Sequence, residues 1–248
     1  MNRTQFQTYL DNYPTAKLRD LVTQMLYDEI VSLRIAPGSK LNVNSIASAL
    51  GISRTPVAEA IQILHERGFV VSRPDVSGYF VLDLSMTDMI NLYDVRTAIE
   101  CEAAALCTEH ADSETVQELE RLANNYRDCL IAKDYDGMLG SDMPFHALIV
   151  KSCGNKYIQK CYEMLLPNLT MYQSSMLKFV SSSHENPWSS SITYNHNAIV
   201  EAIKMRIPEL ARQAMLNHVS SSLNYTMFCG GGADPFSNVR KDKAKNKQ

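Results

Sequence analysis

The stretch GISRTPVAEAIQIL, residues 51–64, joins a glycine stop, a polar helix start and an apolar helix face. Ser53 is a favourable N-cap, and Pro56 falls in the first helical turn, where its missing N–H does no harm. The apolar residues that follow recur at the spacing of one buried helix face, at Val57, Ala60, Ile61 and Leu64. The stretch therefore predicts a helix whose exposed first turn carries Arg54.

Two helices are predicted ahead of this stretch and a β-hairpin after it. Residues 17–33 carry apolar side chains at helical spacing, and Pro37-Gly38 ends that segment. A short helix follows Asn42, a suitable N-cap, and only the tripeptide GIS separates it from the next helix. The runs FVVSR and GYFVL flank PDVS, which predicts a hairpin over residues 69–82. This order of elements is typical of a helix-turn-helix followed by a wing.

Composition places the chain among ordinary globular proteins. It has 248 residues, of which 45% are hydrophobic and 21% charged, enough for a small and a medium domain. The longest apolar runs fall far short of a membrane span, and the polar start lacks the apolar core of a signal peptide. Six cysteines without a CxxC pair are typical of reduced thiols. We therefore expect a cytoplasmic protein with no membrane partner.

Charge is unevenly distributed along the chain. Residues 1–84 hold eight Lys or Arg against eight acidic residues, whereas residues 85–238 hold eleven against eighteen. The last ten residues, VRKDKAKNKQ, carry five basic residues against one acidic residue. A neutral N-terminal segment is not the footprint of a strong non-specific DNA binder. An interpretation as a DNA-binding domain must therefore rest on the motif rather than on net charge.

The pattern changes after residue 84. From there to residue 228 only helical periods are found, which predicts an antiparallel bundle of six or seven helices. The predicted fold class is therefore mostly α, with an N-terminal winged helix-turn-helix at residues 16–82 and the bundle at residues 85–228. Residues 1–15 are predicted to be a flexible arm and residues 229–248 a disordered basic tail.

One aspartate and three histidines fall on helix faces that should point inward. Asp142 and His146 are four residues apart and share a helix face, while His196 and His218 lie on apolar faces of two later segments. A single such histidine is more often a core residue than a ligand. Together the four form a mixed nitrogen and oxygen set that suits zinc, nickel, iron or manganese. From spacing alone, a polar core and a metal site are equally open.

Residues 17–82 resemble the winged-helix domain of the GntR family of bacterial transcription regulators. The resemblance lies in LRIAPGSKLNVNSIASALGISRTPVAEAIQILHERGFV, residues 33–70, and in RPDVSGYFV, residues 73–81. It implies that the chain binds double-stranded operator DNA, as a nucleoid-associated protein, through residues of the helix-turn-helix and the wing. The residues implied are Arg54, Thr55, Ser53, Asn44, Arg34 and Gly78.

The contacts that the motif offers are specific in type. Arg54 can donate two hydrogen bonds to guanine O6 and N7, and Thr55 can reach a phosphate. The family usually has arginine at the positions of Asn44 and Ala58. Losing both removes two contacts worth up to ~1–3 kcal/mol each, which predicts an altered or weaker sequence preference.

Residues 85–228 resemble the FCD domain, the helical effector-binding domain of the FadR-type branch of that family. LYDVRTAIECEAA and HNAIVEAI match it, and so does an aspartate followed by histidines after 4, 50 and 22 residues. The resemblance implies that Asp142, His146, His196 and His218 bind a divalent metal, with zinc preferred over nickel, iron or manganese. Pro144 lies between the first two, and its lost hydrogen bond falls at Gly140. The sequence leaves open whether the helix kinks there and moves Asp142 off the metal.

The resemblance also implies a small organic acid that fills the open coordination positions of the metal. Arg96 matches a recurrent family arginine and could clamp a carboxylate with two hydrogen bonds. The alternative is an ion pair with Glu100, four residues on in the same helix. Possible walls of the effector pocket are Tyr93, Tyr172 and Tyr225.

These features together predict a ligand-responsive transcription regulator rather than an enzyme. A homodimer would bind an inverted-repeat operator, and the metal-bound acid would change its affinity for DNA. Two alternatives stay open, a metal-dependent enzyme and a pure metal sensor built on the same bundle. Against the enzyme, no general base is evident, and the Gly-rich phosphate loop, HExxH and GxSxG motifs are absent from the sequence.

Overall fold

The computed structural model describes residues 1–182 and 195–229, and every structural statement below refers to these. Met1–Ser85 forms one compact unit, and a second begins at Met86. Nearly all of the basic tail predicted over residues 229–248 lies outside the described residues. Within the described part, no helix combines the length and the apolarity that crossing a bilayer requires.

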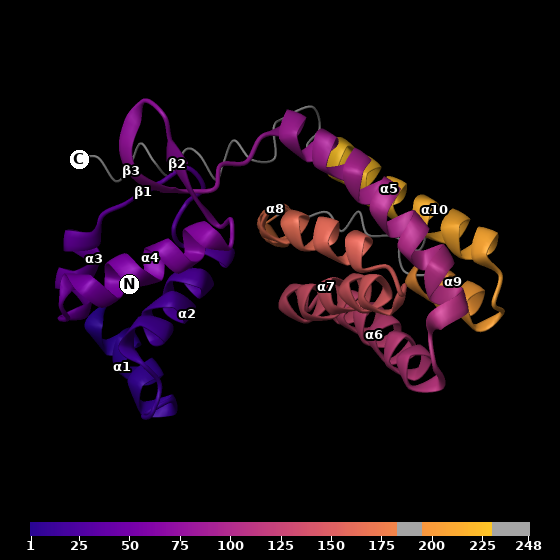
Figure 1. Cartoon of the computed structure of the whole chain (residues 1–248), viewed down its shortest axis with the longest axis horizontal. Helices are drawn as coiled ribbons and strands as arrows, with labels where there is room; N and C mark the ends of the chain where they lie inside the picture. The colour runs from indigo at the N-terminus through magenta and orange to yellow at the C-terminus, as the bar shows by residue number, and fades with distance from the viewer. Residues whose placement is uncertain (183–194, 230–248) are drawn as a thin grey trace. The chain divides into compact units, whose positions relative to one another are not determined.

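The first unit is a winged helix-turn-helix, as the sequence predicts (Figure 1). Its three antiparallel strands lie in the order β1-β3-β2, so that the hairpin of β2 and β3 forms the wing. The helices pack through side chains with no exposed surface, which include Leu26, Ile30, Val57, Ile61 and Leu64. Its elements are α1 (Arg3–Asn12), α2 (Leu18–Val31), β1 (Lys40–Leu41), α3 (Val43–Leu50), α4 (Arg54–Glu66), β2 (Val70–Arg73) and β3 (Val76–Val81).

Local signals set the ends of the two helix-turn-helix helices. The side chain of Asn42 accepts a hydrogen bond from the Ser45 N–H at 3.1 Å, which satisfies a free donor at the start of α3. Gly51 ends α3 with φ of 71°, a left-handed conformation that glycine adopts without a Cβ clash. Ser53 holds the N-cap position of α4 but makes no capping hydrogen bond with its side chain.

Residues 3–12 form helix α1, whereas the sequence predicts a flexible arm there. The Phe6 ring is 1% exposed and anchors this helix to the unit. Two hydrogen bonds join α1 to α2, from Tyr9 Oη to Asp28 at 2.6 Å and from Gln5 Nε2 to Glu29 at 3.0 Å. One buried apolar residue and two hydrogen bonds thus hold α1 in place. Because the helix has no repeating pattern of apolar residues, its sequence did not predict it.

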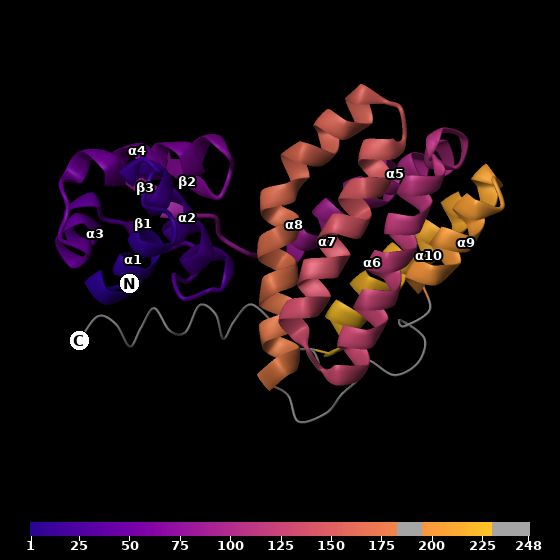
Figure 2. The same ribbon diagram turned by 90° about the horizontal axis from the view of Figure 1, so that it is seen from below.

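The second unit is a bundle of six described helices, within the six or seven predicted (Figure 2). Helix α5 packs along α10, and α6 packs along α7, so that residues far apart in sequence line one interior. The mostly helical fold class predicted from sequence is therefore confirmed. The helices are α5 (Met86–His110), α6 (Ser113–Ala132), α7 (Tyr135–Ser152), α8 (Lys156–Ser182), α9 (Asn195–Lys204) and α10 (Pro208–Cys229).

Candidate metal centre and DNA-binding surface

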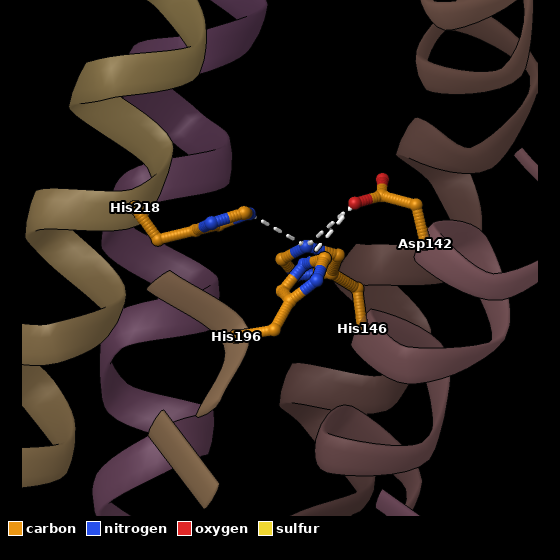
Figure 3. A group of neighbouring side chains, drawn as sticks. All are labelled: Asp142, His146, His196 and His218. Carbon is orange, nitrogen blue, oxygen red and sulfur yellow. Dashed lines mark hydrogen bonds and ion pairs between the residues drawn. The ribbon is translucent and has the colours of Figure 1, made fainter. Parts of the chain in front are cut away.

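Three helices of the bundle bring the predicted ligands together (Figure 3). Asp142 and His146 come from α7, His196 from the first turn of α9 and His218 from the middle of α10. One possible ligand atom from each lies within 4.8 Å of the others. We call these four residues the Asp–His cluster. Residues separated by up to 76 positions in the sequence therefore form one site.

Pro144 does not displace Asp142 from the cluster. Helix α7 runs through the proline as one element, and Asp142 Oδ1 lies 3.2 Å from His196 Nε2. Gly140, the residue whose carbonyl faces the proline ring, is exposed and has no side chain to obstruct it. The helix therefore accommodates the proline without losing the geometry of the cluster.

The spacing within the cluster fits one metal ion. His146 Nε2 and His218 Nε2 are 3.1 Å apart, and His146 Nε2 lies 3.7 Å from Asp142 Oδ1. Adjacent ligands at about 2.0–2.2 Å from one ion are about 3.3 Å apart in tetrahedral geometry and about 3 Å apart in octahedral geometry. Octahedral geometry leaves two positions open beside four protein ligands. His196 is buried, and its Nε2 lies 3.2 Å from Asp142 Oδ1, so that both atoms face the centre of the cluster.

The pKa shifts of Asp142, His196 and His218 favour the forms in which these side chains bind a metal. Burial lowers the pKa of His218 well below its usual value, and the neighbouring His196 and His146 lower it further. Burial also lowers the pKa of His196. Burial would raise the pKa of Asp142, but His146 and His196 outweigh it and hold that pKa well below its usual range. The pKa of His146 is instead raised, because the Glu100 carboxylate outweighs the effect of burial. A divalent cation that binds the anionic Asp142 and the three histidines would therefore displace a proton from His146.

Glu100 is the functional residue that sequence reasoning missed. Its carboxylate has no exposed surface and lies between two partners, His146 Nδ1 at 2.6 Å and Arg96 Nε at 2.7 Å. A carboxylate on Nδ1 fixes the imidazole so that Nε2 faces the cluster. The spacing of Arg96 and Glu100 suggested only an ion pair, and nothing local links Glu100 to a histidine on another helix.

Arg96 is found in the ion pair that was the alternative to an effector clamp. Its guanidinium is buried and sits 5.2 Å from the centre of the Tyr93 ring. Burial would lower the pKa of Arg96, but the Glu100 carboxylate outweighs it and the pKa is raised. One nitrogen, Nη1, has no hydrogen-bond partner among the described residues. Nη1 is therefore the atom of Arg96 that could donate to a carboxylate effector, and this role of Arg96 stays a prediction.

A cavity opens beside the cluster. Asp142 and His218 reach it from the cluster, and Gln173 holds the second carboxylate oxygen of Asp142 at 2.5 Å. Tyr93 lines the cavity as predicted, whereas Tyr172 is buried outside its lining, and the side chain of Tyr225 lies outside the described part. The other lining residues are Tyr126, Met138, Leu139, Met176, Leu177 and Ser222.

The predicted DNA contacts of the first unit divide into two groups. Ser53, Arg54 and Thr55 are exposed at the start of α4, and Arg54 donates to the exposed Asn44 at 3.5 Å. Gly78 is exposed in the wing strand β3. Arg34 differs, because its guanidinium pairs with the buried Glu29 carboxylate at 2.8 Å. It is thus less available for a phosphate than Arg54.

Two family models match the chain. Residues 18–81 match "Bacterial regulatory proteins, gntR family", and residues 91–221 match "FCD domain". The chain is 26% identical over 206 residues to the HTH-type transcriptional repressor RspR of Escherichia coli, covering 83% of this chain and 87% of RspR. It is 27% identical over 187 residues to the gluconate operon transcriptional repressor of Bacillus subtilis, covering 75% of each.

Solved structures agree on the fold. The chain matches Escherichia coli McbR/YncC with a TM-score of 0.67 at 18% identity, covering 85% of this chain and 97% of that one. A putative GntR regulator from Rhodococcus matches with a TM-score of 0.64 at 20% identity, covering 83% and 95%. The two relatives from Escherichia coli and Bacillus subtilis described above are named as transcriptional repressors. The chain therefore belongs to the GntR family of DNA-binding transcription regulators, with a winged helix-turn-helix followed by an FCD domain.

Proposed function

We propose that this regulator senses a small carboxylic acid at a divalent metal held by the Asp–His cluster. The observation that carries the proposal is the meeting of an anionic aspartate and three buried histidines beside a cavity, in a chain with a DNA-binding domain. Zinc is the preferred ion, with nickel, iron or manganese as alternatives. When bound, the metal would supply a positive centre with open positions for a carboxylate oxygen.

The cavity lining favours one class of acid. Most of its side chains are apolar or aromatic, among them Met138, Leu139 and Leu177, and no lysine or arginine is among the described lining residues. A second carboxylate there would lack a cation to offset its desolvation. We therefore propose a monocarboxylate with a small apolar body, rather than a di- or tricarboxylate, as the effector.

The DNA end of the mechanism is a twofold dimer on an inverted-repeat operator. A helix-turn-helix places the first turn of its second helix in the major groove, so two copies of α4 would read two half-sites. The acid would bind one arrangement of the dimer more tightly than another. It would thereby change operator affinity by the difference between those two binding free energies.

The test starts from protein purified without chelators or nickel resin. Elemental analysis should find about one divalent metal ion per chain. Butyrate should then raise the melting temperature in a concentration-dependent way, and succinate, its matched dicarboxylate, should not. Light scattering reports the dimer. Metal-free protein would overturn the metal site, and a response to succinate alone would overturn the effector class.

A pure metal sensor is the alternative that must be distinguished from a sensor of a carboxylic acid. Its operator affinity would depend on the metal but on no carboxylic acid. Fluorescence anisotropy with a labelled duplex, measured with metal, with metal plus butyrate, and after dialysis against a chelator, distinguishes the two. A change only in the third condition would replace the acid-sensing proposal.

A further inference from the structure

The exposed side chain of Arg3, on α1, lies against the turn of the helix-turn-helix. A Cβ placed on Gly51 would lie 3.4 Å from both Arg3 Cδ and Arg3 Nε, which is contact distance. Gly51 belongs to the tripeptide that joins α3 to α4, three residues before Arg54. An arginine from outside the 18–81 match to the GntR model therefore sits beside the start of the helix that enters DNA.

The position of Arg3 is fixed by the docking of α1. Phe6 is buried, and Gln5 and Tyr9 are hydrogen-bonded to α2 on either side of it. Arg3 occupies the first turn of this helix, one turn before Phe6. The backbone of Arg3 is thus fixed by the docked helix rather than carried on a loose chain.

The charge of Arg3 is not neutralised within the described residues. The acidic groups nearest the α1–α2 contact are engaged elsewhere, Asp28 by Tyr9 and Glu29 by Arg34 and Gln5. Arg3 makes no ion pair with any described carboxylate, in contrast to Arg19, which pairs with Asp20 at 3.2 Å. An exposed guanidinium without a counter-ion is suited to a phosphate.

We infer that Arg3 binds a backbone phosphate of duplex DNA beside the first turn of α4. Phosphate contacts set position and affinity without reading sequence. Arg3 therefore supplies affinity, while Arg54 supplies the sequence preference.

Salt dependence of DNA binding by the full-length protein tests this inference. The probes are a labelled mixed-sequence duplex of thirty base pairs and a duplex selected by this protein from a random-sequence pool. Arg3→Met keeps an apolar stem on the Gly51 turn and removes only the charge. It should lower affinity for both duplexes by about 5- to 10-fold at 0.1 M salt and reduce the salt slope by about 1.

Two further variants serve as controls for Arg3→Met. Arg3→Lys should retain most of the affinity, and Arg19→Ala, which removes an exposed charge from α2, should leave the salt slope unchanged. Thermal melting of each variant confirms that α1 stays docked. Arg3→Met with wild-type affinity and slope would show that Arg3 only covers the turn, which would overturn the inference. So would a loss restricted to the selected duplex.

Discussion

The two units use arginine in opposite environments. Arg54 lies exposed at the start of α4 with one long hydrogen bond to Asn44, whereas Arg96 is 1% exposed and paired with the fully buried Glu100. Removing an exposed group changes what the protein binds and leaves its stability nearly unchanged. Removing one member of a buried ion pair strands the other charge in the interior. A substitution at the DNA-binding surface can thus change binding without changing stability. A substitution in the bundle core changes both.

The largest expected effect comes from Glu100→Ala, which leaves Arg96 charged and His146 without its partner. Losing one member of a buried pair costs ~3–5 kcal/mol of unfolding free energy. Urea unfolding of metal-free protein measures it, with Glu120→Ala on the surface of α6 as the control. A loss no greater than that of the control would mean that the buried pair does not differ from an exposed one.

His196→Ala should come next. It removes one of four proposed metal ligands, and we expect the metal to be lost on dialysis together with the thermal response to butyrate. Elemental analysis and melting curves report the two losses. Full metal occupancy in the variant would reject a site that needs all four residues of the Asp–His cluster.

Arg54→Ala should act on DNA binding alone. A bidentate contact to guanine accounts for ~1–3 kcal/mol of discrimination, so the selected duplex should lose most of its advantage over a mixed-sequence duplex. Because Arg54 is exposed, the melting temperature and metal content should not change. Unchanged discrimination, measured by competition between the two duplexes, would remove Arg54 from the role of base reader.

The smallest effect is expected from Tyr9→Phe, which removes the hydrogen bond from α1 to Asp28. Such a bond contributes about 0.5–1.5 kcal/mol. Hydrogen exchange of the α1 amides should accelerate by a corresponding factor while the bundle amides stay unchanged. Equal exchange in wild type and variant would show that Phe6 alone docks α1.

Prediction from sequence succeeded where signals are local. Asn42, Gly51 and the apolar period of α4 lie within a few residues of the ends that they specify, and the winged helix-turn-helix follows from them. The four members of the Asp–His cluster were also identifiable, because each lies on an apolar helix face. Their convergence within 4.8 Å depends on packing that only the fold supplies.

The misses have a common physical cause. Helix α1 buries a single apolar residue and is held by polar contacts to residues 19 and 24 positions away, so no helical period reveals it. Glu100 reaches His146 across two helices, 46 positions apart in sequence. Both depend on side-chain contacts between segments, which spacing in one segment does not encode. The effect of Pro144, which the sequence left open, also depends on the fold, in which helix α7 continues through the proline.

Helix α5 connects the Arg96–Glu100 pair to the end of the first unit. It runs unbroken from Met86, the residue that follows the first unit, through Glu100 to His110. The fourteen steps along the helix from Met86 to Glu100 span ~21 Å at 1.5 Å per residue. A tilt of about 10° pivoting at Glu100 would therefore displace the start of α5 by ~3–4 Å. The carboxylate that contacts His146 therefore lies in the same unbroken helix as Met86, the residue joined covalently to the DNA-binding unit.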